Sequence, residues 1–164
     1  MNSRRLNYRK FSPDDIQNYA RWYCNDDVMK HIAGRGLTQE EMKARFAQAI
    51  AVNQQHPQLG YYAAYHKDNN DFIGITKLVF TTPSQVEVGY GSLPECWGKG
   101  YASEMLAAAV THVQASCSEV TELVAIVNPA NTGSKKVLTN RLFEWYDSGM
   151  MYGLPVEYYK LKLK

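Results

Sequence analysis

Two glycines, Gly98 and Gly100, flank Lys99 directly before an apolar pattern that predicts a helix. The first amide N–H groups of a helix have no intrahelical partner, and they lie at the positive end of its dipole. Glycine lets a backbone approach a phosphate closely, and a lysine adds a mobile cation. The stretch therefore predicts a site for an anion, although a plain strand-to-helix turn explains the two glycines equally well.

Two common phosphate motifs do not fit this stretch. A P-loop requires a glycine five residues before its Gly-Lys pair and a serine or threonine after it, but Leu93 and Gly100 occupy those positions. A dinucleotide fingerprint of the form GxGxxG requires a third glycine where this chain has Ser103. Both motifs are therefore excluded, and the anion must be held in another way.

The glycine pair lies between a predicted strand and a predicted helix. In "VEVGYGS", residues 86–92, the valines and Tyr90 share one face, while Glu87 and the two glycines share the other. Two glycines within a strand predict a bulge, or a ligand that approaches the backbone closely. After the pair, apolar residues recur from Ala102 at i, i+3, i+4, i+7, i+8 and i+11, which is typical of a buried helix face.

Cap residues predict where the other helices begin. "SPDD" and "TQEE" give helix starts with Ser12 and Thr38 as N-caps, the second of them a capping box. A further short helix follows Asn131 or Thr132, either of which can serve as its cap.

Strands are predicted between these helices, so the order is strand, two helices, three strands, helix, strand, helix, two strands. This order predicts an α/β protein with a mixed sheet covered by helices. The length of the chain favours one domain, residues 1–164.

Composition excludes several classes of function. A formal net charge of +2 without a basic stripe argues against nucleic acid as a partner, and no apolar window is long enough to span a membrane. The three cysteines are widely spaced and form neither a disulfide framework nor a metal motif, so we expect no bound metal and a cytoplasmic location. They are Cys24, Cys96 and Cys117.

The stretch from Glu95 to Gly100 resembles motif A of the GNAT N-acetyltransferase superfamily, Q/R-x-x-G-x-G/A, with Glu95 in the first place. The longer stretch "LPECWGKGYASEM" is similar to a subgroup that acetylates the N-terminal alanine or serine of ribosomal proteins. "DDIQNYARWYCNDDVMKHI" and "NTGSKKVLTNRLF" resemble the first helix and the N-x-x-S helix of that subgroup. The chain departs from the pattern at Asn140 and Leu142, where the subgroup usually has lysine and glycine.

The resemblance implies a fold and an activity. The fold would be GNAT-like, with a mostly antiparallel seven-stranded sheet, splayed between strands four and five, and four flanking helices. The activity would be direct transfer of acetyl from acetyl-CoA to a primary amine, either a peptide N-terminus or a small amine, in a ternary complex. A non-catalytic acyl-CoA-binding sensor or scaffold is the alternative. The chain would be a monomer or a homodimer.

The resemblance also assigns roles. Backbone N–H groups around the glycine pair would hold the pyrophosphate, the strand before them would pair with the pantetheine arm, and Asn131 would bind that arm. Glu87 would deprotonate the amine and Ser134 would protonate the leaving thiolate, although a salt-bridged glutamate and a helix-cap hydroxyl are simpler interpretations of these two. The expected cofactor-binding residues are Tyr90, Ser92, Trp97, Gly98, Lys99, Gly100, Tyr101, Ala102, Ser103, Asn131 and Ser134.

The acceptor is not fixed by the fold or by the cofactor. We expect the walls of its site to come from the first two helices, from the loop between residues 25 and 36, and from the loop between residues 147 and 155.

Overall fold

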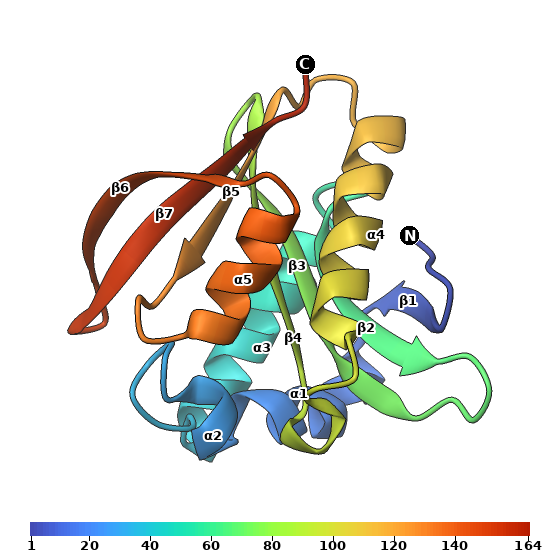
Figure 1. The fold of residues 1–164 in the computed structure, drawn as a ribbon. Helices are drawn as coiled ribbons and strands as arrows, with labels where there is room; N and C mark the ends of the chain where they lie inside the picture. Colours follow the sequence, from blue (N-terminus) through green and yellow to red (C-terminus); the bar gives the residue numbers. More distant parts are fainter.

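A computed structural model describes every residue from Met1 to Lys164 and contains one seven-stranded sheet with helices on both faces (Figure 1). The strand order is β1-β2-β3-β4-β5-β7-β6, and only β4 and β5 run parallel. The strands are β1 Leu6–Lys10, β2 Gly60–His66, β3 Phe72–Thr82, β4 Gln85–Ser92, β5 Glu122–Val127, β6 Glu144–Met151 and β7 Leu154–Lys162. The α-helices are α1 Ile16–Tyr23, α2 Asp26–Met29, α3 Gln39–Asn53, α4 Tyr101–Ser116 and α5 Thr132–Asn140.

The predicted α/β class and element order are confirmed, with one addition. Between the first two predicted helices the structure has a one-turn helix, α2, which was not expected. It forms because the Asn25 side chain accepts a hydrogen bond from the Val28 N–H at 3.1 Å, and two aspartates occupy its first turn. The Thr38–Glu41 capping box at the start of α3 is present as predicted. That the chain forms one domain stays a prediction.

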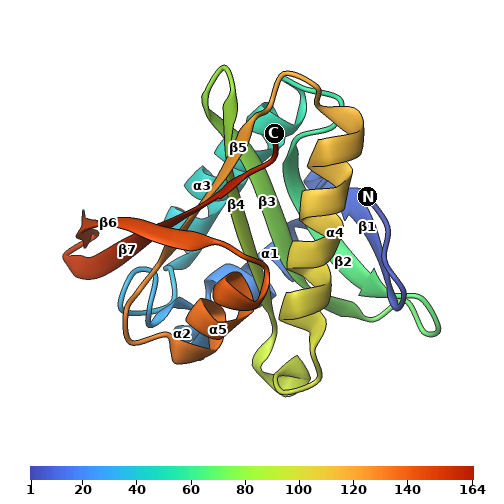
Figure 2. The same ribbon diagram turned by 45° about the horizontal axis from the view of Figure 1, so that its top comes forward.

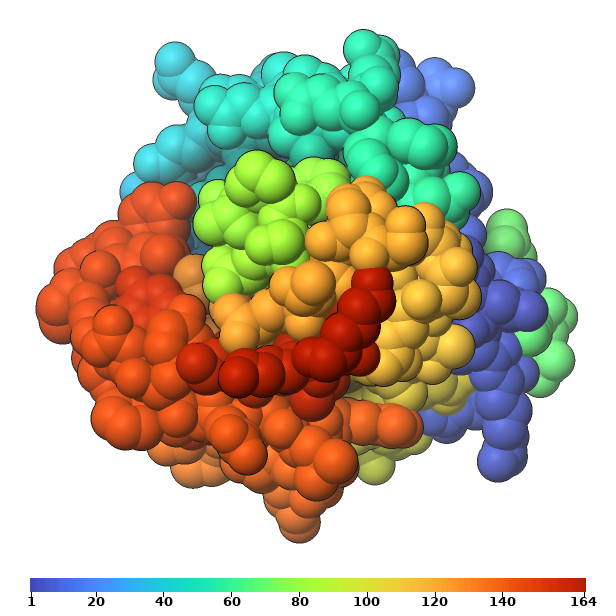
Figure 3. All heavy atoms as spheres, turned by 90° about the horizontal axis from the view of Figure 1, so that it is seen from above, coloured from blue at the N-terminus to red at the C-terminus, as the bar shows by residue number.

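The sheet opens between β4 and β5. These two strands pair only from Gln85 to Glu87, against Glu122 to Val124, after which β5 stays with β7 and β4 stays with β3 (Figure 2). The C-terminal residues lie beside the α4–β5 loop (Figure 3), where the Leu163 N–H donates to the Thr121 carbonyl at 2.8 Å. The predicted splay is therefore confirmed, and it opens at the end of the sheet away from this contact.

The prediction of a bulge at Gly89 and Gly91 is wrong. The β3–β4 register runs without interruption from the Gly74–Ser92 pair to the Phe80–Val86 pair. Packing explains Gly91 instead, because a Cβ atom there would lie only 2.8 Å from Cζ2 of the Trp22 indole.

Two buried apolar clusters pack the helices against the sheet. One contains Tyr19 of α1 and Phe46 of α3, and the other contains Leu106 of α4 and Leu138 of α5. These side chains are the buried stripes of amphipathic helices, and their burial drives the helices onto the sheet.

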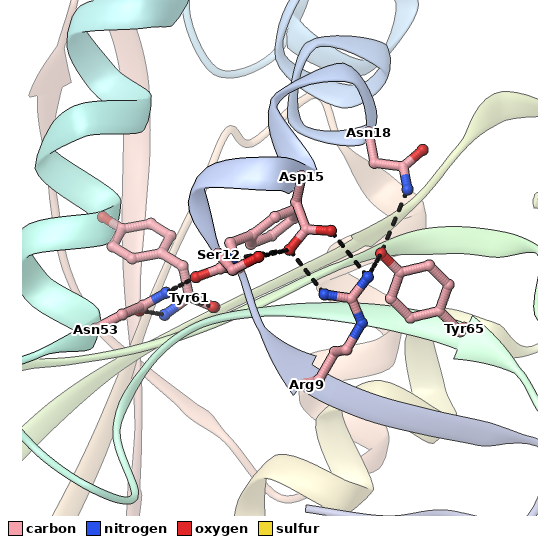
Figure 4. A network of polar contacts seen from close by, with 8 residues as sticks. Arg9, Ser12, Asp15, Asn18, Asn53, Tyr61 and Tyr65 are labelled. Atoms are coloured by element: carbon pink, nitrogen blue, oxygen red, sulfur yellow. Dashed lines mark hydrogen bonds and ion pairs between the residues drawn. The ribbon is translucent and has the colours of Figure 1, made fainter.

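A polar network fixes α1 and α3 against the sheet (Figure 4). The Arg9 guanidinium donates two hydrogen bonds to Asp15 at 2.7 and 2.8 Å, and Asp15 in turn accepts from the Ser12 N–H. Asn53, at the end of α3, exchanges hydrogen bonds with the backbone of Tyr61 in β2. The start of α1 and the end of α3 are thereby tied to the sheet.

No helix combines the length and the apolar character needed to cross a bilayer.

Candidate active site

A cleft of about 570 Å³ runs from the start of α4 along the open edge of β4 to the start of α5. We call it the cofactor cleft. Every predicted cofactor-binding residue lines it except Lys99. Lys99 is exposed, and its Nζ donates to the Glu95 carbonyl at 3.2 Å. The structure thus brings together the segments of β4, α4 and α5 that the sequence analysis linked.

Unpaired amides surround one end of the cofactor cleft. No backbone N–H from Gly98 to Ser103 donates a hydrogen bond within the protein. Gly98 and Gly100 adopt φ values of +74° and +81°, which side-chain-bearing residues rarely adopt. Unpaired amides at the N-terminus of a 16-residue helix form a site for an anion.

The open edge of β4 lies along the same cleft. The Leu93 N–H donates to the Ile73 carbonyl at 2.8 Å, so Gly74 and Ser92 face each other as a non-hydrogen-bonded pair. Alternation along the strand then directs the N–H and C=O of Tyr90 away from β3, toward the splay. The Ser92 carbonyl already accepts from Nε1 of Trp97 at 2.8 Å, which holds the following loop against the strand.

Asn131 and Ser134 lie at the start of α5. The Asn131 side chain caps the helix by accepting from the Ser134 N–H at 3.1 Å, so Asn131 rather than Thr132 is the cap. The Ser134 hydroxyl is therefore not needed as a cap, and it lies 3.3 Å from the Tyr90 hydroxyl. Burial raises the pKa of Tyr90 to about 12, against a weaker lowering effect from Ser134, so the phenol stays protonated at neutral pH.

A second hollow, of about 470 Å³, meets the first, and we call it the acceptor cavity. Its lining includes residues of α1, α3, the loop after α2 and the turn between β6 and β7, the segments predicted as walls, together with residues of β3, β4, β5 and α5. That this hollow holds the acceptor stays a prediction. The two hollows share six residues, which form their junction: Trp22, His31, Ile32, Tyr90, Asn131 and Ser134.

Glu87 lines the acceptor cavity in an ion pair. Its carboxylate lies 2.6 Å from Nζ of Lys77, and the two side chains are 21% and 25% exposed. Glu87 is therefore salt-bridged, and it also lines the acceptor cavity. Its role as a base stays a prediction.

Sequence reasoning did not single out two charged cavity residues, Lys77 and Arg45, or the contact that Arg45 makes with Tyr152. Lys77 is the lone charge in the apolar stretch "FIGITKLVF", and this was the one usable signal. Arg45 donates to the Tyr152 hydroxyl at 3.0 Å across 107 residues of sequence, a contact that no local pattern predicts.

Outside both hollows, ligand atoms of His56, Cys117 and Glu119 lie within 4.8 Å of one another. Nδ1 of His56 accepts hydrogen bonds from the Gln58 and Leu59 N–H groups at 3.1 and 3.2 Å, which places the proton on Nε2. Nε2 then has no lone pair for a metal and instead faces Glu119 at 3.4 Å. This geometry favours a hydrogen bond rather than a metal site.

The acetyltransferase (GNAT) domain profile matches residues 5–141 of the chain. The chain belongs to the GNAT acetyltransferase family. Among curated proteins, this acetyltransferase is 22% identical over 142 residues to "Uncharacterized N-acetyltransferase YoaA" of Bacillus subtilis, covering 85% of the chain and 80% of that protein. The family predicted from the glycine pair and its neighbouring motifs is confirmed.

Solved structures share the fold of the acetyltransferase. RimL, a ribosomal L7/L12 alpha-N-protein acetyltransferase in complex with coenzyme A, matches with a TM-score of 0.80 and 17% identity over 98% of this chain and 95% of its own. A spermidine N-acetyltransferase from Vibrio cholerae, in complex with coenzyme A and spermine, matches with a TM-score of 0.79 and 13% identity over 97% and 96%. At these identities the likeness establishes the fold, and it leaves the acceptor open.

Proposed function

We propose that this acetyltransferase transfers acetyl from acetyl-CoA directly to a primary amine, with both substrates bound at once. The observation that carries the proposal is that the cofactor cleft and the acceptor cavity meet at Tyr90 and Ser134. Bound acetyl-CoA would supply a reactive thioester carbonyl at this junction. An acceptor in the adjoining cavity could then attack without a covalent intermediate on the protein.

The cofactor cleft fits coenzyme A in two respects. The unpaired amides from Gly98 to Ser103 suit a diphosphate, and each such contact with a helix N-terminus contributes roughly 0.3–1 kcal/mol. The N–H and C=O of Tyr90 suit the amides of an extended arm, which would add to the sheet as a further strand. The Asn131 oxygen caps α5, so its amide N–H groups are the part that can reach the arm.

Glu87 is the proposed general base. An alkyl ammonium with a pKa of about 10 must lose a proton before it can attack. Glu87 is the one carboxylate that lines the acceptor cavity, and Lys77 fixes its orientation. It would take the proton directly or through a water molecule.

Ser134 is the proposed donor to the leaving thiolate, with Tyr90 behind it. The two hydroxyls lie 3.3 Å apart, and either can donate to the other. Because Tyr90 stays protonated at neutral pH, it can replace a proton that Ser134 gives up.

The cellular location, the partner and the oligomeric state are proposed on separate grounds. All three cysteines are unpaired, which fits a reducing cytoplasm. A primary amine, small or at a peptide N-terminus, would be the partner. The choice between a monomer and a homodimer stays a prediction.

The test combines calorimetry with coenzyme A and an assay of thiol release from acetyl-CoA over a panel of amines and N-terminal peptides. We expect tight coenzyme binding, turnover with part of the panel, and intersecting initial-velocity lines. Ser134→Ala and Tyr90→Phe should each lower kcat about tenfold or more. Tyr90→Phe keeps the backbone groups proposed to bind the arm, so its coenzyme affinity should stay unchanged. Coenzyme binding without turnover on any amine would favour the acyl-CoA-binding sensor or scaffold instead.

A further inference from the structure

The acceptor cavity carries an excess of positive charge. Its charged lining residues are two cations, Arg45 and Lys77, and one anion, Glu87, so their net charge is +1. Lys77 and Glu87 neutralise each other at 2.6 Å. Arg45 takes part in none of the ion pairs of the protein. It is therefore the cation in this cavity without a counter-ion.

Arg45 is held in place by aromatic rings rather than by a carboxylate. Its guanidinium carbon lies 5.6 Å from the ring centre of Tyr23 and 5.6 Å from that of Tyr152. Nη2 donates to the Tyr152 hydroxyl at 3.0 Å, which uses one of the five N–H donors. The side chain is half-buried and oriented, and most of its donors have no partner within the protein.

No other group in the cavity changes this net charge at neutral pH. Burial and the neighbouring Lys30 ammonium both lower the pKa of His31, which lines the same cavity, so that His31 is neutral at pH 7. The remaining polar groups are the indole N–H of Trp22 and the hydroxyls and amides of tyrosine, asparagine, glutamine and serine side chains.

We infer that Arg45 binds a carboxylate of the acceptor, so that the substrate is a primary amine that also carries a carboxylate. This inference rests on the proposed function, because it takes the acceptor cavity to hold the amine. A guanidinium presents paired N–H donors in a planar fork that matches a carboxylate, and its energetic value rises where water is partly excluded.

The charge balance also argues against a polyamine. A polycation needs several carboxylates, and the cavity offers Glu87 alone, already paired with Lys77. A free amino acid and a peptide with an acidic residue near its N-terminus present the same chemistry to Arg45. These two sources differ in size, and the experiment separates them.

The experiment measures binding and turnover with matched acceptor pairs. The pairs are alanine with alaninamide, and the peptide amides Ala-Asp and Ala-Asn, titrated into coenzyme A-loaded protein and assayed with acetyl-CoA. We expect the acid of at least one pair to have a Kd and a KM about 10- to 100-fold lower than its amide. Preference within the first pair identifies a free amino acid, and preference within the second identifies an acidic peptide.

Variants assign the preference to Arg45. Arg45→Gln should abolish the preference, mainly through KM, and Arg45→Lys should restore part of it. Lys43→Gln removes an exposed charge from the same helix and should leave the preference intact. The inference is overturned if acid and amide bind equally well in both pairs, or if Arg45→Gln weakens both members of a pair alike. If the acids bind preferentially but no amine is acetylated, the carboxylate site stands and the proposed transfer fails.

Discussion

The cofactor cleft and the acceptor cavity are built in different ways. The cleft is lined by the stretch from Tyr90 to Ser103, whose amides form its anion site, by the start of α5, and by residues between Trp22 and Ile32. The cavity uses side chains from α1, α3, β3, β4 and the β6–β7 turn. The anion site of the cleft therefore depends on local backbone geometry, whereas the cavity depends on tertiary packing.

The electrostatic properties of the two hollows differ in the same way, since one uses backbone groups and the other uses side chains. The cleft attracts an anion with unpaired amides and a helix dipole, which most side-chain substitutions leave intact. The cavity uses formal charges on Arg45, Lys77 and Glu87, each of which one substitution removes. A chain can thus keep its cofactor while its acceptor changes. Of the four predictions below, those at Glu87 and Gly100 test this separation, and those at Asp15 and Leu142 test the fold around it.

The largest effect is expected at Glu87. Glu87→Gln should lower kcat about 100- to 10,000-fold because the amine loses its base, while the Kd for coenzyme A stays unchanged. Initial-velocity kinetics and calorimetry would measure the two quantities, and a thermal melt would show whether the unpaired Lys77 destabilises the fold. Glu144→Gln, at an exposed position on β6, is the matched control. Unchanged kcat in Glu87→Gln would remove this residue from the chemistry.

The second effect concerns the network that ties α1 to the sheet beside the cavity. Asp15→Asn should lower the free energy of unfolding at pH 7 by about 2 kcal/mol, because Arg9 and Ser12 lose a charged acceptor.

The effect should depend on pH. Burial opposes ionisation of Asp15, but donors from Arg9 and Ser12 outweigh it and lower its pKa below the ordinary value of 3.8. The stabilisation is therefore complete well above that value and is lost as the pH falls through the lower, folded-state pKa. Urea unfolding at pH 7 and at pH 3 should show a smaller difference between variant and wild type at pH 3. A difference that grows on acidification would contradict the account.

The third effect tests the cleft. Gly100→Ala should raise the Kd for coenzyme A about tenfold, because a side chain at φ +81° strains the turn that presents the amides. Gly34→Ala introduces the same strain at φ +82° with no neighbouring atom within 4 Å of the new Cβ, and it lies outside both hollows. Both variants should lose stability, and only Gly100→Ala should lose coenzyme affinity. Equal coenzyme affinities for the two would argue against the amide site.

The smallest effect is a gain. Leu142 follows α5 with φ +65° and is 77% exposed, at the position where the subgroup that the chain resembles usually has glycine. Leu142→Gly should raise the free energy of unfolding by about 0.5–1 kcal/mol, since it relieves a left-handed backbone at little cost in buried surface. Chemical denaturation would measure the gain, and a loss of stability would show that Leu142 makes a contact worth more than the strain.

The difference between the two hollows also explains what the sequence could predict. Caps, strand alternation and the helical stripe of α4 are local, so they predicted the element order. The resemblance to the GNAT motifs supplied the cofactor-binding residues, and all of them except Lys99 line the cleft. Glu87 could be proposed as a base, but its partner Lys77 depends on the β3–β4 register, which a single sequence does not fix.

Two other features depended on tertiary packing. The contact between Arg45 and Tyr152 joins α3 to the β6–β7 turn, and no local rule relates them. For Gly91 the sequence predicted a bulge or a ligand close to the backbone. The packing against Trp22 could not be predicted, because Trp22 lies on a helix about seventy residues earlier. Sites made of backbone follow from local pattern, and sites made of distant side chains require the fold.

A crystal structure with coenzyme A bound tests the central claim most directly. We predict diphosphate oxygens within hydrogen-bonding distance of the amides between Gly98 and Ser103, and the sulfur atom at the junction beside Ser134 and Tyr90. A coenzyme bound outside the cofactor cleft, or one whose sulfur lies away from the acceptor cavity, would contradict the account.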